Sequence, residues 1–144
     1  MGLFDFAFNL GKKIFEKDED APKEIKKHIE EDNPGVEDLD VTYEDGKVVM
    51  TGKASSAEAL EKTVLMAGNV EGVESVDVSG VEAPASESNV KIYEIRKGDT
   101  LWKIAEKHLG NGARYTEIFE ANKEVIKNPD LIYPGQKIRI LLDD

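Results

Sequence analysis

The stretch YEIRKGDTLWKIAEKHLGN, residues 93–111, decides the fold of the carboxyl-terminal part of the chain. It opens on the end of an alternating apolar run typical of a strand, and Asp99 or Thr100 is placed to cap a helix. The apolar face of that helix comprises Leu101, Ile104, Ala105, His108 and Leu109. A second helix is expected around Ile118, and Pro134 with Gly135 predicts a turn before a last strand. Residues 90–142 therefore predict a module with the order β-α-α-β.

Composition changes just upstream of this module. The stretch VEAPASESN, residues 81–89, is rich in Ala, Pro, Ser and Glu and has no apolar periodicity. We therefore predict a linker at residues 83–89.

Residues 21–82 predict a second module, with the order α-β-β-α-β. A first helix starts near Pro22, and Asp45-Gly46 is a strong hairpin signal between two apolar runs. Ser55 followed by Glu58 predicts a capping box for the next helix, which Gly68 is placed to end. The stretch VESVDVS supplies the last strand. The whole chain is thus predicted to be α+β.

The opening stretch, MGLFDFAFNLGKKIFEKDED, is unusually apolar. Plotted at 100° per residue, its apolar side chains fill an arc of roughly 200°. We predict an amino-terminal apolar helix over residues 1–20, wedged between two bodies as part of the core. A membrane-surface helix is the alternative, weakened by the few basic residues beside the aromatic face. A secretory signal is not expected, because Asp5 and Asn9 interrupt the run and Lys12 and Lys13 follow it.

The charge is strongly negative and unevenly distributed. The net charge is −11; residues 1–89 carry 9 Lys and Arg against 21 Asp and Glu, and residues 90–142 carry 10 against 7. Such a field disfavours nucleic acid and anionic membranes and favours cations. The chain has no cysteine and no apolar run long enough to span a bilayer, so we expect a cytoplasmic protein. Nucleophile-elbow, Walker and dinucleotide-binding motifs are absent from the sequence, and we expect no enzyme.

Both modules resemble known families. Residues 22–82, with DGKVVMTG and GNVEGVESVDV, resemble a BON domain; residues 91–141, with the stretch quoted above and NPDLIYPGQKIRI, resemble a LysM domain. Together with the opening MGLFDF, this arrangement is similar to that of a family of bacterial cytoplasmic potassium-binding proteins. The resemblance implies a potassium ion as ligand.

Two places could offer spare carbonyl oxygens to such an ion, which is bound well by several neutral oxygens. One is GNVEGV, residues 68–73, where a helix ends and two glycines widen the choice of backbone conformation. An ordinary helix cap with a tight turn is the alternative there. The other place is the opening segment, if Gly11 ends a first short helix and frees the carbonyls before it.

The resemblance implies which residues bind the ion and how the protein responds to binding. In that family, main-chain oxygens of the amino-terminal segment and of the BON glycine loop hold the ion. Carried over to this chain, these are the carbonyls of Ala7, Leu10, Gly68, Val70 and Val73, with Asn69 as a further candidate. We expect a monomer that compacts when it binds one K⁺ and so acts as a sensor.

Glycan binding is the alternative function, because LysM domains commonly bind N-acetylglucosamine polymers such as peptidoglycan. The resemblance places the groove between two loops, formed by Gly98, Asp99, Thr100, Asn128, Pro129, Asp130, Leu131 and Ile132. Trp102 could stack on a sugar, although partial burial against the neighbouring module is favoured.

Overall fold

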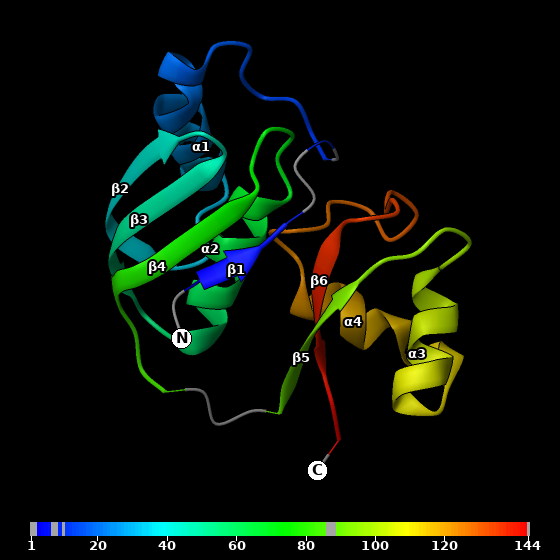
Figure 1. Ribbon diagram of the computed structural model, residues 1–144. Coiled ribbons are helices and arrows are strands. Elements are labelled where there is room, and N and C mark those ends of the chain that lie inside the picture. The colour runs from blue at the N-terminus through cyan, green and yellow to red at the C-terminus, as the bar shows by residue number, and fades with distance from the viewer. Residues whose placement is uncertain (1–2, 7–8, 10, 86–88, 144) are drawn as a thin grey trace. The chain divides into compact units, whose positions relative to one another are not determined.

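The computed structural model describes residues 3–6, 9, 11–85 and 89–143 of the chain (Figure 1). The chain divides into two compact units, residues 1–86 and 87–144, hereafter the amino-terminal and carboxyl-terminal units. The division falls within the stretch predicted to be a linker. Each unit combines helices with strands, which confirms the α+β class.

A four-stranded sheet with the order β1-β4-β3-β2 is the centre of the amino-terminal unit. Its strands are β1 (Leu3–Asp5), β2 (Val36–Glu44), β3 (Lys47–Ala54) and β4 (Ser75–Glu82). The predicted hairpin is present between β2 and β3. Asp45 (φ 46°) and Gly46 (φ 84°) both take the positive φ that its tight turn requires. β4 then runs parallel to β3 after a helical crossover.

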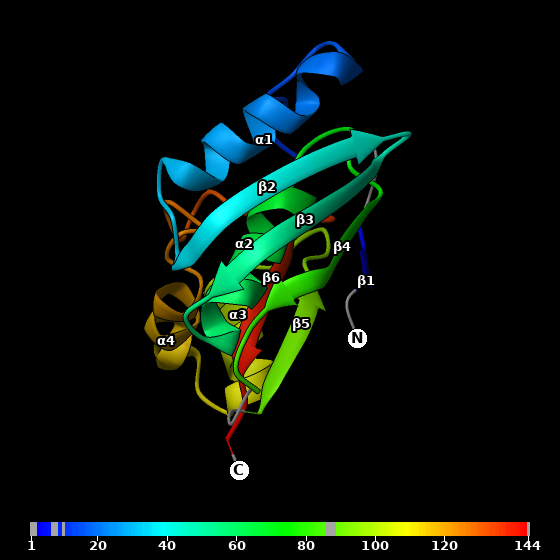
Figure 2. The same cartoon turned by 90° about the vertical axis from the view of Figure 1, so that its left-hand side faces the viewer.

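Two helices pack against this sheet, α1 (Ala21–Glu30) and α2 (Ala57–Gly68). α1 contacts β2, α2 contacts β3 and β4, and the two helices contact each other, so both cover one face of the sheet. Figure 2 shows α1 alongside β2. The core between these layers includes the fully buried Ile25, Ile29, Val48, Met50 and Leu65.

The predicted amino-terminal helix is wrong for the described residues of that stretch. Leu3–Asp5 form β1, which pairs antiparallel with β4 so that Phe4 lies opposite Val76. A single 3₁₀ turn, η1 (Asp18–Asp20), precedes α1. The physical reason is the free edge of β4, whose unpaired backbone groups are satisfied by a strand and not by a helix.

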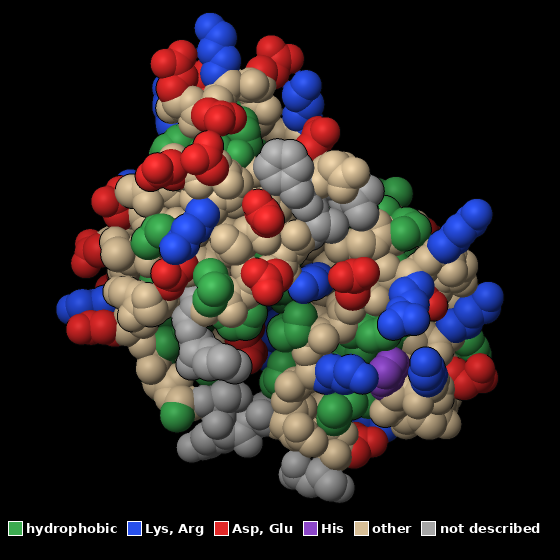
Figure 3. Space-filling view, in the orientation of Figure 1, with side chains coloured by type: hydrophobic (Ala, Val, Ile, Leu, Met, Phe, Trp, Pro, Cys, Tyr) green, Lys and Arg blue, Asp and Glu red, His purple; other side chains and the backbone are tan. Residues whose placement is uncertain are grey.

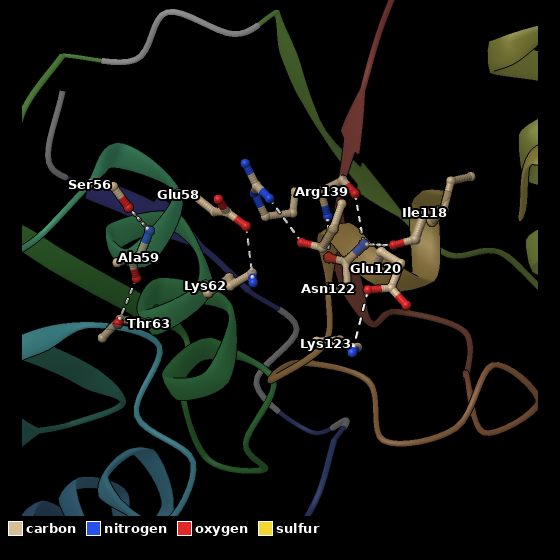
Figure 4. Close-up of polar contacts among 11 residues, drawn as sticks. Ser56, Glu58, Ala59, Lys62, Thr63, Ile118, Glu120, Asn122, Lys123 and Arg139 are labelled. Carbon is tan, nitrogen blue, oxygen red and sulfur yellow. Dashed lines mark hydrogen bonds and ion pairs between the residues drawn. The ribbon is translucent and has the colours of Figure 1, made fainter. Parts of the chain in front are cut away.

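Two details of α2 also differ from the prediction. The cap is Ser56 and not Ser55: the Ser56 hydroxyl accepts a hydrogen bond from the Ala59 amide at 3.0 Å (Figure 4). Gly68 is the last helical residue, but the next residue, Asn69, has φ −81°, so the helix does not end in a left-handed glycine. The glycine at position 68 therefore needs another explanation, which its packing in the candidate site provides.

The carboxyl-terminal unit follows the predicted order β-α-α-β. Its elements are β5 (Val90–Glu94), α3 (Leu101–Leu109), the 3₁₀ turn η2 (Gly112–Arg114), α4 (Tyr115–Ala121) and β6 (Lys137–Leu141). β5 and β6 pair antiparallel. The Thr100 hydroxyl caps α3 by accepting from the Lys103 amide at 3.1 Å, and Gly110 (φ 79°) ends it. Four of the five residues predicted for the apolar face of α3 pack with Ile118, Ile126, Ile138 and Ile140 into one core; His108 is only half-buried and is not part of it.

Two polar side chains join the elements of this unit. Buried Asn122 donates to the carbonyls of Ile118 (2.7 Å) and Arg139 (2.8 Å) and accepts from the Arg139 amide (2.8 Å), linking the end of α4 to β6 (Figure 4). Arg114 donates to Glu117 and to Asp143 through paired bonds of 2.7–2.9 Å. The bonds of Asn122 to Arg139 and of Arg114 to Asp143 join residues 17 and 29 positions apart, with good hydrogen-bond geometry.

The uneven charge of the sequence lies at the surface. On the face seen in Figure 3, Asp and Glu side chains gather over the amino-terminal unit. In the described part of the chain, no helix has both the length and the apolar character needed to cross a bilayer.

Candidate functional site

The candidate ion site is built on the loop that follows α2, residues 68–73, which we call the glycine loop. The last carbonyls of a helix have no partner within the helix and carry partial negative charge. After the Asn69 amide closes on Leu65, the chain turns sharply: the Val73 amide donates to the Val70 carbonyl at 3.2 Å. Gly72 has φ +98°, as the third position of a type II turn requires. Because Val70 and Val73 are fully buried, their side chains anchor this turn in the core.

The amino-terminal segment crosses directly over this loop. Lys12 and Val70 form an isolated parallel bridge: the Lys12 amide donates to the Asn69 carbonyl (3.3 Å), and the Glu71 amide donates to the Lys12 carbonyl (3.0 Å). Gly11, with φ +105°, makes the crossing feasible, since a Cβ there would lie 2.5 Å from the Asn69 oxygen. The two places singled out from the sequence therefore meet at the backbone level.

Phe6 fastens the segment before the crossing. Its amide donates to the Glu74 carbonyl at 2.8 Å, and its ring lies so close to Gly68 that a Cβ at that position would be 2.1 Å from it. Position 68 therefore requires glycine because the Phe6 ring leaves no room for a Cβ, and its backbone dihedral angles do not require glycine. This contact has no local sequence signal, since 62 positions separate the two residues.

Aromatic side chains fasten the segment after the crossing. The ring of Phe15 meets that of Tyr43 edge to face, with centroids 5.2 Å apart, and lies against Gly72. The Tyr43 hydroxyl donates to the Gly72 carbonyl at 2.7 Å. Sequence reasoning missed Tyr43, because only the sheet brings β2 to this loop.

The predicted ligands divide into three groups. The carbonyls of Asn69 and Val70 each accept a backbone hydrogen bond, and a carbonyl oxygen has two lone pairs. Within the described part of the chain, the Gly68 and Val73 carbonyls accept no hydrogen bond. Ala7 and Leu10 lie outside the described residues. The loop thus offers neutral oxygens at one backbone crossing, which is the chemistry that a large monovalent cation prefers.

Acidic and histidine side chains are also possible metal ligands. Among residues 3–6, 9, 11–85 and 89–143, no group of three or more His, Asp or Glu side chains is placed to hold a metal ion.

A second candidate site lies within the carboxyl-terminal unit. A hollow of about 460 Å³ is lined by Asp99, Thr100, Leu101, Trp102, Tyr115, Pro129, Asp130 and Ile132. Five of the eight predicted glycan residues are among them, whereas Gly98, Asn128 and Leu131 are not in the lining. Trp102, named from the sequence as a possible stacking residue, also lines the hollow, and Leu101 and Tyr115 line it without having been predicted. Trp102 is 51% exposed; its ring lies over Gly112 and beside Tyr115, with ring centroids 6.1 Å apart.

Asp99 organises one wall of this hollow. Its carboxylate accepts from the Tyr93 hydroxyl (2.6 Å) and from the Arg96 amide (2.8 Å). Burial acts to raise the pKa of Asp99, but these hydrogen bonds and the positive charges of Lys107 and Arg96 together leave the pKa below its usual value. The wall is therefore a fixed anionic turn beside an exposed indole ring.

The comparisons with known proteins agree with this architecture. The BON domain model matches residues 17–83 and the LysM domain model matches residues 93–141. The protein is thus a BON–LysM protein. It is 39% identical to the "Potassium binding protein Kbp" of Escherichia coli, over 97% of this chain and 98% of that protein. The chain belongs to the family of that protein.

Other relatives match smaller parts. An uncharacterised protein of Deinococcus radiodurans is 34% identical over 71% of this chain and 44% of its own length. SpoIVD-associated factor A of Bacillus subtilis is 47% identical over 51 residues, which are 35% of this chain and 12% of that protein.

Proposed function

We propose that this protein binds a potassium ion through main-chain oxygens where the amino-terminal segment crosses the glycine loop. The observation that carries the proposal is the pair of hydrogen bonds between Lys12 and the loop, made at a glycine that no larger residue could replace without moving the segment. The name of the E. coli relative, which is similar over its whole length, points to the same ion.

The ligands in this proposal are the loop carbonyls of Gly68, Asn69, Val70 and Val73 together with those of Ala7 and Leu10. The loop carbonyls come from a buried turn and from the end of α2, and carbonyls at a helix end carry partial negative charge. A cation there relieves their mutual repulsion. The segment and the loop then hold each other more tightly, so binding compacts the protein.

A reversible response of this kind makes the protein a sensor of potassium in the cytoplasm. In this proposal it acts as a monomer, binds one ion and catalyses no reaction. The amino-terminal unit, which contains the BON domain, supplies the ion site. The carboxyl-terminal unit, which contains the LysM domain, supplies a separate binding surface.

Ion titration tests the proposal. Protein freed of ions is titrated with K⁺, Rb⁺, Na⁺ and Mg²⁺ in a calorimeter, and K⁺ and Rb⁺ are expected to bind while Na⁺ and Mg²⁺ bind far more weakly. A ligand that binds only the folded state stabilises it by about 2.7 kcal/mol at one hundred times its dissociation constant. KCl is therefore expected to raise the melting temperature more than NaCl at equal ionic strength.

The comparison with NaCl is essential because the amino-terminal half is strongly acidic, and any salt screens its self-repulsion. Equal stabilisation by the two salts would mean that screening explains the effect and would refute potassium binding.

A second function, glycan binding by the LysM unit, is favoured by the exposed Trp102 at the hollow. An indole face beside hydrogen-bonding turns suits an N-acetylglucosamine polymer. Trp102→Ala is expected to abolish co-sedimentation with chitin or peptidoglycan. Leu141→Ala is the matched control, because Leu141 on β6 is 41% exposed and lies outside the lining. Failure of the unaltered protein to co-sediment would exclude this function.

A further inference from the structure

One hydrogen bond fixes the orientation of a peptide group inside the glycine loop. Tyr43, near the end of β2, donates from its hydroxyl to the Gly72 carbonyl, 29 positions further along the chain, at 2.7 Å. The carbonyl and the amide of one peptide unit point in opposite directions because the unit is planar and trans. Holding the Gly72 oxygen therefore aims the amide of the next residue, Val73, to the other side.

The Val73 amide donates a hydrogen bond to the carbonyl of Val70, which is one of the candidate ligands. It points at the Val70 carbonyl at 3.2 Å and closes the turn. A chain of two hydrogen bonds thus runs from the Tyr43 hydroxyl, through the Gly72–Val73 peptide, to an oxygen in the proposed ion site. Rotation of this peptide would release Val70 and turn the Gly72 oxygen inward. Gly72, at φ +98°, has the conformational freedom for such a change.

Tyr43 also contacts the amino-terminal segment that crosses the glycine loop. The ring of Phe15 meets it edge to face, and both aromatic residues contact Gly72. The neighbouring turn supports the same arrangement, since the Gly46 carbonyl accepts from the amides of Glu74 (2.7 Å) and Ser75 (3.2 Å). The end of the loop is therefore fixed to the β2–β3 hairpin by main-chain bonds, and the Gly72–Val73 peptide is fixed by Tyr43.

The hydroxyl of Tyr43 stays protonated under physiological conditions. Burial raises its pKa, and the nearby carboxylates of Asp18 and Asp45 raise it further, although a backbone hydrogen bond from Gly46 opposes them. The group therefore acts as a donor, and a carbonyl is the acceptor that matches it.

We propose that Tyr43 is a positioning residue for potassium: its hydroxyl holds the Gly72–Val73 peptide in the orientation that presents the Val70 carbonyl to the ion. This inference rests on the proposed potassium site and adds a side chain to a site otherwise made of backbone. Tyr43 contributes to selectivity, because a fixed set of oxygens cannot contract around a smaller cation.

The test compares Tyr43→Phe with Tyr93→Phe in the full chain. Each change removes one hydroxyl and keeps the ring, and Tyr93 is matched because its partly buried hydroxyl donates to Asp99 at 2.6 Å in the other unit. K⁺ and Na⁺ are titrated into each protein by calorimetry. Tyr43→Phe is expected to weaken K⁺ binding roughly tenfold, the effect of one lost hydrogen bond, and to lower the preference for K⁺ over Na⁺. Tyr93→Phe is expected to leave both unchanged.

Hydrogen exchange of the Val73 amide supplies a readout that general destabilisation would not reproduce. In the ion-free protein, Tyr43→Phe should speed exchange at Val73 more than at amides of the β2–β3 hairpin, and circular dichroism should show an unchanged fold. K⁺ affinity and preference equal to those of the unaltered protein would overturn the role of Tyr43 and leave the potassium site standing. An equal loss in both variants would also overturn it. Absence of K⁺-specific heat in the unaltered protein would overturn the proposed function itself.

Discussion

Replacing Gly11 with alanine probes the backbone crossing most directly. The added Cβ would lie 2.5 Å from the Asn69 oxygen, a distance at which real side chains are essentially never found, so the segment would have to move away from the loop. Alanine is also strained at φ +105°, which costs about 1–3 kcal/mol. Loss of the two hydrogen bonds made by Lys12 adds about 1 kcal/mol for each bond.

Added together, these contributions favour detachment of the segment by about 3–5 kcal/mol. If only the attached form binds the ion, the apparent dissociation constant rises by the factor by which that form is depleted. A factor of ten corresponds to about 1.4 kcal/mol, so K⁺ affinity is expected to fall at least about tenfold.

Calorimetric titration with K⁺ measures the effect, and Gly110→Ala is the matched control. Gly110 also has a positive φ, +79°, but a Cβ there meets no atom within 4 Å. The control bears the backbone strain alone, in the other unit, and should lower the melting temperature without changing K⁺ affinity. A folded Gly11→Ala protein that binds K⁺ as tightly as the unaltered chain would refute the crossing as the ion site.

Two further predictions concern stability. Ser56→Ala is expected to destabilise the amino-terminal unit by about 1 kcal/mol in urea unfolding, because it removes the cap of α2. Ser55→Ala, the control, should change the free energy of unfolding by less than about 0.5 kcal/mol. Equal effects of the two substitutions would contradict the assignment of Ser56 as the cap. Arg114→Gln removes the hydrogen bonds that hold the pKa values of its two carboxylate partners below their usual range. A lowered carboxyl pKa stabilises the folded state above the unfolded pKa, and this stability is lost as pH falls through the folded one. The difference in melting temperature between Arg114→Gln and the unaltered protein should therefore shrink from pH 7 to about pH 3; a constant difference would contradict this linkage.

Local signals were sufficient to predict most elements of both units. The Asp45-Gly46 turn needs positive φ at two consecutive residues, and few dipeptides tolerate that, so it could be recognised without the rest of the chain. The order of elements in the carboxyl-terminal unit was predictable for the same reason. The cap at Thr100 and the glycine after α3 are set by residues within a few positions of each other.

Local signals could not decide which of two neighbouring serines caps α2. Ser55 and Ser56 are both good caps, and Glu58 favoured the first by its spacing. In the structure, the Ser56 hydroxyl accepts from the Ala59 amide, and α2 begins at Ala57.

The amino-terminal stretch shows a stronger limit. Its apolar residues are compatible with a helix when judged alone, but the edge of β4 offers backbone partners to a strand. Local propensity is worth a fraction of a kcal/mol per residue, and satisfying a sheet edge outweighs it.

The sequence by itself determined the two modules, their order of elements, the glycine loop and the kind of oxygen that loop can offer, because these depend on residues close together along the chain. Only the tertiary structure decided that the opening segment is a strand, that Gly11 crosses the loop at Asn69, and that Tyr43 holds the Gly72 carbonyl. Those contacts join residues at least 29 positions apart, and their geometry exists only after the sheet has brought β1, β2 and the end of α2 together.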